Sequence, residues 1–145
     1  DDTNPSKEKG EYADNILKDL KTLGVDVEAD KKDGYVTLSH TSDHFDKIKK
    51  EAIKLIKEGK AFMDDTPQEQ MKVEREGRVH SKHRDDDVDK NLKNFKDMCA
   101  GTAPQWCLRA KIDMSSDNGT LRDPVMMMQG SQDCICIRLL WVGYS

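Results

Sequence analysis

The chain has 145 residues, which is enough for one domain, or for one domain and part of another. Charged residues make up 36% of it and hydrophobic residues 35%, so the apolar area available for burial is limited and the fold would gain stability from neighbouring segments. The formal net charge of −4 at pH 7 argues against a dedicated nucleic-acid-binding domain, which is usually basic, although an acidic protein can carry a local basic patch.

A helix is predicted close to the N-terminus, over residues 5–23. Asn4 is a suitable N-cap, Pro5 fits the first helical position, and Gly24 fits the left-handed position after the helix. Apolar residues recur along it with helical spacing: Tyr12, Ile16, Leu20 and Leu23, flanked by Ala13 and Leu17. The five residues Asp1 to Pro5 are predicted to form a strand-to-helix turn at the rim of a site.

The next segments alternate between strand and helix. A β-favouring run at residues 35–38 predicts a strand, and Thr41 and Ser42 are candidate N-caps of a second helix that ends at Gly59. The lysines on this second helix are interpreted as a solvated face. Residues 61–63 predict another short strand. The alternation favours a parallel sheet with crossover helices, which is an α/β fold.

The composition changes after residue 64. Thr66 and Glu69 form a capping box with Pro67 between them, so a helix should follow, although it has no apolar stripe and should lie on the surface. Residues 77–84 form a basic connection (this name is kept below). Acidic residues 85–87 should cap a further helix. Helical spacing predicts that its buried stripe consists of Val88, Leu92, Phe95 and Met98. Asp89 and Lys93, four residues apart, are predicted to form an ion pair.

The last well-patterned region predicts a hairpin. Apolar residues alternate with other residues from Trp106 to Ile112, as expected for a strand. A turn follows at residues 115–119, where an Asn-Gly step allows the chain to pair back on itself.

No self-contained catalytic constellation is found in the sequence. His80 and His83 have no third ligand at zinc spacing, and basic neighbours would repel a cation, so no metal site is expected. No Gly-rich phosphate loop or nucleophile elbow is present. The basic connection and the preceding turn of helix are the best candidates for phosphate contacts, and an ordinary charged surface loop is the alternative.

The cellular context is also limited by the sequence. No apolar run of roughly 18 residues and no secretory leader occurs, so neither a membrane span nor secretion is expected. The four cysteines include no Cys-x-x-Cys pair, which is typical of reduced thiols in a cytoplasmic protein. Because the chain starts at Asp1 without an initiator Met, a preceding segment is expected.

Eight short motifs occur in a characteristic order along the chain. They are Asp1-Asp2-Thr3-Asn4-Pro5, Thr41-Ser42-Asp43-His44-Phe45, Gly59-Lys60-Ala61-Phe62, Asp64-Asp65-Thr66-Pro67, Glu69-Gln70-Met71-Lys72, Ser81-Lys82-His83-Arg84, Arg109-Ala110-Lys111-Ile112-Asp113-Met114 and Leu121-Arg122-Asp123-Pro124-Val125. In this order they resemble the glutamyl-tRNA synthetases, which are class I aminoacyl-tRNA synthetases. The resemblance covers residues 1 to about 125 and is greatest to the eukaryotic cytosolic type, including the glutamyl half of the bifunctional glutamyl-prolyl enzyme.

The resemblance implies a Rossmann-type catalytic domain that is interrupted by an insertion for the tRNA acceptor end. Residues 1–60 would belong to the first Rossmann half and residues 61–125 to the insertion, whereas residues 126–145 form a divergent tail that is either a β-forming apolar end or the product of a truncated gene model. The related glutaminyl enzymes share some of the motifs and fit less well over residues 64–84.

The resemblance also implies an activity and its substrates. Glutamate would be activated with ATP and Mg²⁺ and transferred to tRNA-Glu in the cytoplasm, possible partners being other synthetases in a complex. Asp1 would lie near the ammonium group of glutamate, where a fixed carboxylate orients a cation. The implied tRNA acceptor contacts in the insertion are Arg75, Arg78, Lys82 and Arg84. No catalytic residue or metal ligand is assigned.

Two departures from the family pattern bear on activity. The His-Ile-Gly-His signature and the Lys-Met-Ser-Lys-Ser-type loop, which hold ATP in this family, are absent. We therefore expect a fragment that does not form the adenylate as an isolated chain. The alternatives are a non-catalytic fragment that binds tRNA or a synthetase-complex partner, and a fragment of a glutamine–tRNA ligase.

Overall fold

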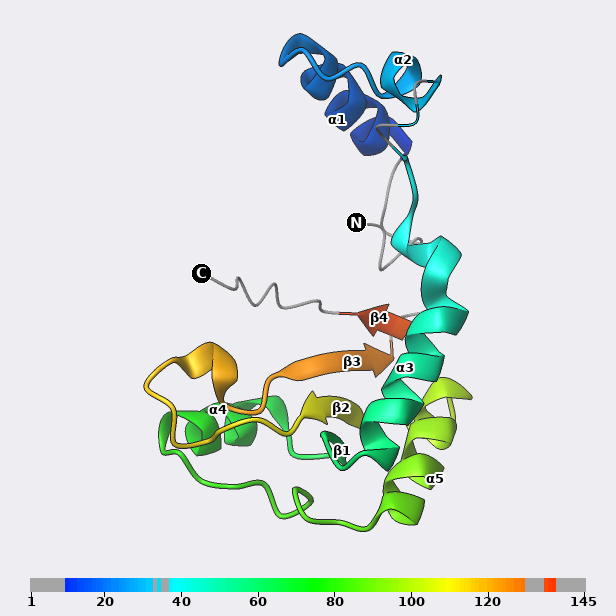
Figure 1. Ribbon diagram of the computed structural model, residues 1–145. Coiled ribbons are helices and arrows are strands. Elements are labelled where there is room, and N and C mark those ends of the chain that lie inside the picture. The colour runs from blue at the N-terminus through cyan, green and yellow to red at the C-terminus, as the bar shows by residue number, and fades with distance from the viewer. Residues whose placement is uncertain (1–9, 33, 35–36, 130–134, 138–145) are drawn as a thin grey trace.

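The computed structural model describes residues 10–32, 34, 37–129 and 135–137, and Figure 1 shows their arrangement. Helices and strands are mixed along the chain, which confirms the α/β class. The elements are α1 (Gly10–Thr22), α2 (Val27–Lys32), the 3₁₀ turn η1 (Thr41–His44), α3 (Phe45–Lys57), β1 (Ala61–Asp64), α4 (Gln68–Glu76), α5 (Val88–Cys99), β2 (Cys107–Ala110), the 3₁₀ turn η2 (Gly119–Leu121), β3 (Val125–Gln129) and β4 (Ile135–Ile137).

The sheet is antiparallel, so the predicted parallel sheet is wrong. Its order is β1-β2-β3-β4, and each neighbouring pair runs in opposite directions. β1 and β2 are joined by two helices and the basic connection, and this connection brings β2 back beside β1 in the opposite direction. Of the predicted strand at residues 35–38, the described residues 37 and 38 have no regular secondary structure. The predicted hairpin is confirmed, since β2 and β3 pair antiparallel around residues 111–124.

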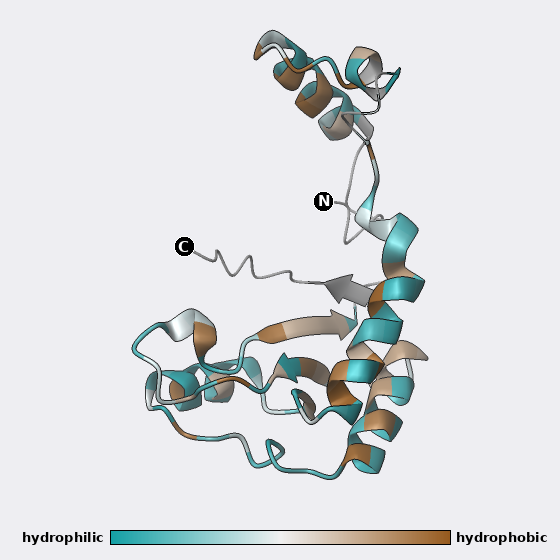
Figure 2. Cartoon of the chain, viewed as in Figure 1, coloured by the Kyte–Doolittle hydropathy of each residue, from teal (hydrophilic) through white to brown (hydrophobic). Residues whose placement is uncertain are grey.

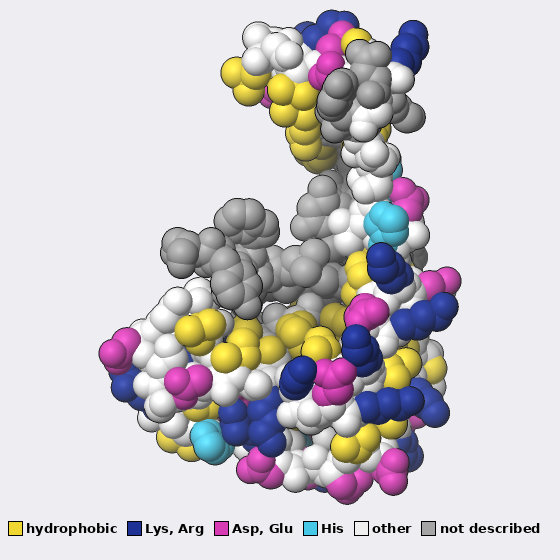
Figure 3. Space-filling view, in the orientation of Figure 1, with side chains coloured by type: hydrophobic (Ala, Val, Ile, Leu, Met, Phe, Trp, Pro, Cys, Tyr) yellow, Lys and Arg dark blue, Asp and Glu magenta, His cyan; other side chains and the backbone are white. Residues whose placement is uncertain are grey.

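One face of the sheet is covered by α3 and α5 and forms the core (Figures 1 and 2). The amphipathic pattern of both helices accounts for this, because their apolar side chains face the strands and their charged side chains face solvent. Lysines on the outer face of α3 are interspersed with acidic side chains in Figure 3, as the solvated interpretation predicts. The core residues are Ala52, Ile56, Ala61, Met63, Phe95, Met98, Leu108 and Met127.

α1 and α2 lie away from the sheet and pack against each other (Figure 1). The helix predicted over residues 5–23 is confirmed from residue 10 to Thr22, and Gly24 adopts the expected left-handed conformation with φ +89°. The predicted N-cap, Asn4, lies outside the described residues. The short helix α2 was not predicted, because the alternating charges at residues 25–34 carry no helical apolar stripe. The apolar face of α1 remains open to solvent, with Ile16 58% and Leu23 80% exposed.

The starts of two helices differ from the predicted caps. Thr41 and Ser42 lie within η1 rather than capping α3. α4 begins after Pro67, which is its N-cap and provides no side-chain hydrogen bond. The predicted capping box is wrong because the hydroxyl of Thr66 donates instead to the buried carboxylate of Asp64, at 2.6 Å.

The start of α5 matches the prediction that acidic residues cap it. The Asp87 carboxylate accepts a hydrogen bond from the backbone N–H of Lys90 at 2.8 Å. Phe95 and Met98 of the predicted stripe are buried. The predicted pair of Asp89 with Lys93 is wrong: Lys93 instead reaches one turn onward to Asp97, at 2.9 Å.

Removing this cap should weaken α5. Asp87→Ala should lower the free energy of unfolding by about 1 kcal/mol, since one backbone N–H in the first turn of the helix loses its side-chain acceptor. Urea unfolding of the chain and the variant measures the change. Asp87→Asn is the matched control, because Asn caps as well as Asp and should leave the stability nearly unchanged. Equal losses in both variants would show that charge, and not the cap hydrogen bond, is what matters.

The end of the chain adds a strand to the sheet. β3 includes the start of the segment predicted as a divergent tail, and β4 pairs with it, placing Met127 opposite Ile137. Residues 130–134 and 138–145 lie outside the described part of the chain. None of the helices in the described ranges combines the length and apolar character that a membrane-spanning helix needs.

Candidate functional site

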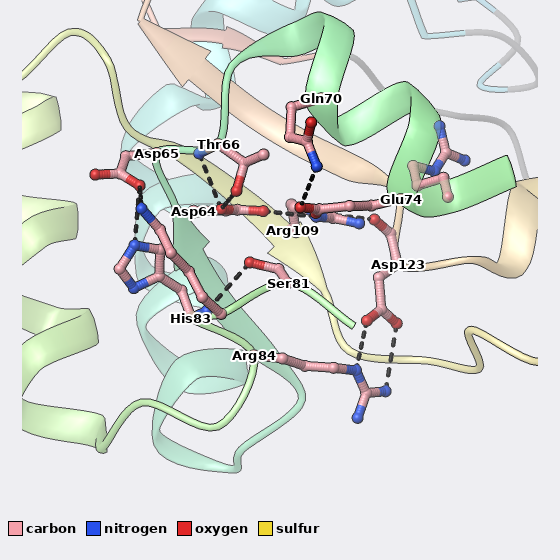
Figure 4. A network of polar contacts seen from close by, with 12 residues as sticks. Asp64, Asp65, Thr66, Gln70, Glu74, Ser81, His83, Arg84, Arg109 and Asp123 are labelled. Atoms are coloured by element: carbon pink, nitrogen blue, oxygen red, sulfur yellow. Dashed lines mark hydrogen bonds and ion pairs between the residues drawn. The ribbon is translucent and has the colours of Figure 1, made fainter. Parts of the chain in front are cut away.

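A buried ion pair lies on the face of the sheet opposite α3 and α5 (Figure 4). Asp64 ends β1, Arg109 lies in β2, and the carboxylate of Asp64 accepts from Arg109 Nη1 at 2.5 Å. Both side chains are almost completely buried. The guanidinium of Arg109 also lies over the ring of Phe62, 5.3 Å from its centroid. The alternation in residues 106–112 predicts that Arg109 points away from the core. It does not predict that polar groups of Asp64 and Asp123 bury the Arg109 side chain on that face.

Hydrogen bonds keep the Asp64 carboxylate charged. Burial works to raise the pKa of Asp64, but hydrogen bonds from Thr66 and Arg109 outweigh it, so the pKa lies below its usual value. Thr66 donates twice to the same oxygen, from its backbone N–H at 3.0 Å and from its hydroxyl at 2.6 Å. The end of β1 and the start of α4 are thereby held together.

Asp123 joins this pair to the basic connection. Its carbonyl accepts from Arg109 Nε at 2.8 Å, and its carboxylate accepts from Arg84 Nε at 2.6 Å and from the backbone N–H of Ile112 at 2.7 Å. Asp123 is fully buried and has φ +41°, an uncommon conformation for a residue other than glycine. Asp64, Arg109, Asp123 and Arg84 therefore form one continuous network, visible in Figure 4.

Arg75 and Arg122 lock α4 to the hairpin loop. Arg75 Nε donates to the carbonyl of Arg122 at 2.8 Å, and Arg122 Nη1 donates to the carbonyl of Arg75 at 3.2 Å. Arg75 Nη2 also donates to the carbonyl of Gly119 at 2.7 Å. Burial and the nearby charges of Arg109 and Arg122 lower the pKa of Arg75. Of the four predicted acceptor contacts, Arg75 and Arg84 thus have inward, intramolecular roles.

Arg78 and Lys82 face solvent instead. The side chain of Arg78 is 47% exposed and forms an ion pair with Asp117 at 2.6 Å. Lys82 is 67% exposed and contacts Asp65 at 3.1 Å. The structure therefore brings the four predicted basic residues to one region, but presents only these two as exposed cations.

His83 is held between two carboxylates. Its Nδ1 lies 2.6 Å from Asp86 and its Nε2 lies 2.9 Å from Asp65. The ring of Trp106 lies 5.0 Å away, centroid to centroid. Burial works to raise the pKa of Asp65 and of Asp86, but hydrogen bonds from Lys82 and Lys90, respectively, and from His83 lower both. These contacts tie the basic connection to the end of β1.

The same region does not suit a metal ion. Oxygen or nitrogen atoms of Asp64, Asp65 and His83 lie within 4.8 Å of one another, which is compatible with a cation by distance alone. However, Arg109 and Lys82 already neutralise the two carboxylates, and a divalent ion would have to displace both. The described residues therefore do not fit Mg²⁺.

An open groove of about 1010 Å³ borders the network. It lies between α4 and the strands, with Met71, Arg75, Trp106, Val125 and Met128 among its lining residues. Cys107 also lines it, but burial, and next the charge of Asp64, raises the pKa of that thiol to about 12, so it is not a nucleophile at neutral pH.

Asp1, the predicted contact of the glutamate ammonium group, lies outside the described residues. Sequence reasoning missed Asp64, Asp65, Arg109, Asp117, Arg122 and Asp123 as members of the site. A usable signal existed for two of them, since an Asp that ends one apolar strand and an Arg inside another are charges of opposite sign with the same need for a partner.

Comparisons with known proteins agree on one family. The family profile described as "tRNA synthetases class I (E and Q), catalytic domain" matches residues 1–131. The chain is 52% identical over 128 residues to the bifunctional glutamate/proline–tRNA ligase of Cricetulus griseus, with 87% of this chain and 8% of the relative covered. It is 50% identical over 126 residues to the probable cytoplasmic glutamate–tRNA ligase of Encephalitozoon cuniculi, with 87% and 18% covered.

A plant relative gives the same result. The cytoplasmic glutamate–tRNA ligase of Arabidopsis thaliana is 45% identical over 127 residues, with 86% of this chain and 17% of the relative covered. The chain thus spans less than a fifth of the length of these relatives.

Proposed function

Because the chain belongs to the class I tRNA synthetases for glutamate and glutamine, and matches their catalytic domain, we propose that it is a segment of a glutamate–tRNA ligase. The fold is accordingly a partial α/β class I catalytic domain. All relatives compared above are named as ligases for glutamate, alone or together with proline, which favours glutamate over glutamine. Two of them are named cytoplasmic, which supports a cytoplasmic place of action.

The activity proposed for the whole enzyme is ATP-dependent activation of glutamate, followed by its transfer to tRNA-Glu. Mg²⁺ and ATP would act in the first step, and the described residues do not fit that metal. Asp1 would face the substrate ammonium group. One relative is named as a bifunctional glutamate/proline–tRNA ligase, so the proposal also includes association of this enzyme with a second synthetase.

Within this activity, residues 1–60 would contribute to the Rossmann half and residues 61–125 to the insertion that holds the tRNA acceptor end. The observation that carries this assignment is the presentation of Arg78 and Lys82. The side chains of Arg78 and Lys82 are exposed. The basic connection that carries them is held to the hairpin by the ion pair of Arg84 with the buried Asp123. Cations on a fixed backbone suit phosphate contacts, which position a nucleic acid without reading its bases.

Arg78→Ala and Lys82→Ala should each weaken binding of tRNA-Glu to the chain several-fold at low salt. Each should also reduce the slope of log affinity against log salt by about 1, because one phosphate contact is lost. Filter binding across a salt series measures both quantities. Lys93→Ala is the matched control, since it removes an exposed lysine that is ion-paired on α5. Unchanged affinity and slope in both test variants would contradict the acceptor-end assignment.

The ligase assignment has a separate test. The complete polypeptide that carries this segment should exchange pyrophosphate into ATP in the presence of glutamate and tRNA-Glu, and should do so poorly with glutamine. Asp1→Ala should raise the glutamate concentration needed for half-maximal exchange. Exchange that depends on glutamine instead would move the assignment to the related ligase.

A further inference from the structure

We propose that Asp117 is an intramolecular competitor for Arg78, occupying this arginine in place of an RNA phosphate and thereby limiting RNA affinity. The proposal rests on the function proposed above and deepens it. It assigns a role to an acidic side chain, whereas the acceptor-end assignment concerns basic ones.

The backbone that carries Arg78 is fixed. Arg78 adopts φ +60° and follows Gly77, the C-cap of α4, and the amides on either side of Arg78 bond back into the helix. The N–H of Gly77 donates to the carbonyl of Val73 at 2.8 Å, and the N–H of Val79 donates to the carbonyl of Glu74 at 2.8 Å. This is a left-handed helix ending, and it sets the direction in which the Arg78 side chain leaves the chain.

The backbone that carries Asp117 is fixed to the same helix. Arg122 donates to the carbonyl of Ser116 at 2.6 Å and to the carbonyl of Asp117 at 2.9 Å. The same guanidinium donates to the carbonyl of Arg75 in α4. Both partners of the Arg78–Asp117 pair are therefore anchored to one frame, and their proximity follows from the fold.

The pair itself is short but open to solvent. Arg78 Nη2 lies 2.6 Å from Asp117 Oδ1, and the Asp117 side chain is 96% exposed. Within the part of the chain that the structure describes, Arg78 is the one side chain to which this carboxylate hydrogen-bonds. Exposed ion pairs of this kind contribute little to stability, so a phosphate can displace the carboxylate.

Competition is therefore favoured over assistance. A carboxylate that is 96% exposed orders Arg78 only weakly, whereas its charge would repel any phosphate brought to the same guanidinium. Like charges placed near a binding surface are a known means of limiting unwanted association. An RNA would bind through Arg78 only where its other contacts, such as one with Lys82, offset this repulsion.

The test is the affinity of the chain for a tRNA-Glu transcript at low salt. Asp117→Asn should bind about two- to fivefold more tightly than the unchanged chain, and the gain should fade as salt screens the charges. Asp97→Asn is the matched control, because Asp97 is also a surface acid paired with a cation, and it lies on α5. The Asp117→Asn gain should exceed that of this control and should vanish in an Arg78→Ala background.

The outcomes separate the two proposals. Equal or weaker binding by Asp117→Asn, with weaker binding by Arg78→Ala, would overturn the competitor role and leave the acceptor-end assignment standing. A gain that persists without Arg78, or that equals the Asp97→Asn gain, would show general electrostatics and would overturn the inference. No effect of Arg78→Ala alone would overturn the Arg78 contact on which both depend.

Discussion

Replacing Asp64 with Ala should lower the free energy of unfolding by about 3–5 kcal/mol, because it leaves the buried Arg109 guanidinium without its carboxylate partner. Both side chains of the pair are inaccessible to solvent, so water cannot replace the lost contact. Thr66 would also lose the acceptor of two hydrogen bonds. Urea unfolding followed by tryptophan fluorescence in a Trp141→Phe background, where Trp106 near this network is the remaining tryptophan, measures the loss.

Two variants bracket this result. Asp85→Ala removes an exposed carboxylate that pairs with Lys111 at 2.7 Å, and it should cost no more than about 1 kcal/mol. The double variant Asp64→Leu with Arg109→Met should be more stable than Asp64→Ala, because no buried charge remains unpaired. If Asp64→Ala and Asp85→Ala lost the same stability, the buried pair would have no special role.

The pH dependence of stability should change in the same variant. The pKa of Asp64 is lower in the folded chain than its ordinary value near 3.9, so its stabilising contribution is fully present above that value. The contribution is lost as the pH falls below about 4 and through the folded-state pKa. The difference in stability between the chain and Asp64→Ala should therefore shrink with acidification. A difference that stays constant from pH 7 to pH 3 would contradict this account.

Phe95→Ala should destabilise the chain by about 3–5 kcal/mol through loss of buried area and creation of a cavity. Phe95 is 2% exposed and lies in the core between α5 and the sheet, with Ile56 and Leu108 in the same cluster. The dense packing of a core allows only partial collapse around the missing ring. Thermal or urea unfolding of the same preparation measures the change.

A smaller truncation at Phe95 and a truncation at an exposed position test whether the cavity causes this loss of stability. Phe95→Leu should cost clearly less than Phe95→Ala, since it leaves a smaller cavity. Val73→Ala should change the stability by no more than about 0.5 kcal/mol, because Val73 is 62% exposed on α4. A small loss for Phe95→Ala would indicate that this part of the core repacks.

Sequence reasoning succeeded where a local pattern was sufficient. Gly24 and Gly59 both adopt the left-handed conformation expected after a helix, and Asp87 caps α5 as an acidic residue before an apolar stripe should. It failed where a distant partner decides the outcome. Thr66 has the spacing of a helix cap, but the buried carboxylate of Asp64 takes its hydroxyl.

The sheet and the site show the same limit. The direction of β2 relative to β1 depends on the path that two helices take between these strands. The apolar periodicity of the sequence does not predict that path. The four basic residues of the predicted surface were found from the basic composition of this stretch and from the insertion that the family resemblance implies. Arg75 and Arg84 point inward, and Arg78 and Lys82 point outward. For the three arginines this depends on carbonyls and carboxylates 39 to 47 residues away, and for Lys82 it depends on Asp65.

The separation of α1 and α2 from the sheet means that the chain need not unfold as one cooperative unit. Their backbone hydrogen bonds are local, and Tyr12, Ile16 and Leu23 bury little area that would hold α1 in place. Local opening should therefore expose the amides of α1 to hydrogen exchange at a lower free energy than the amides of β1 and β2. Trp106 packs against the core of the sheet, so its signal follows that larger unit and not the opening of the helical pair.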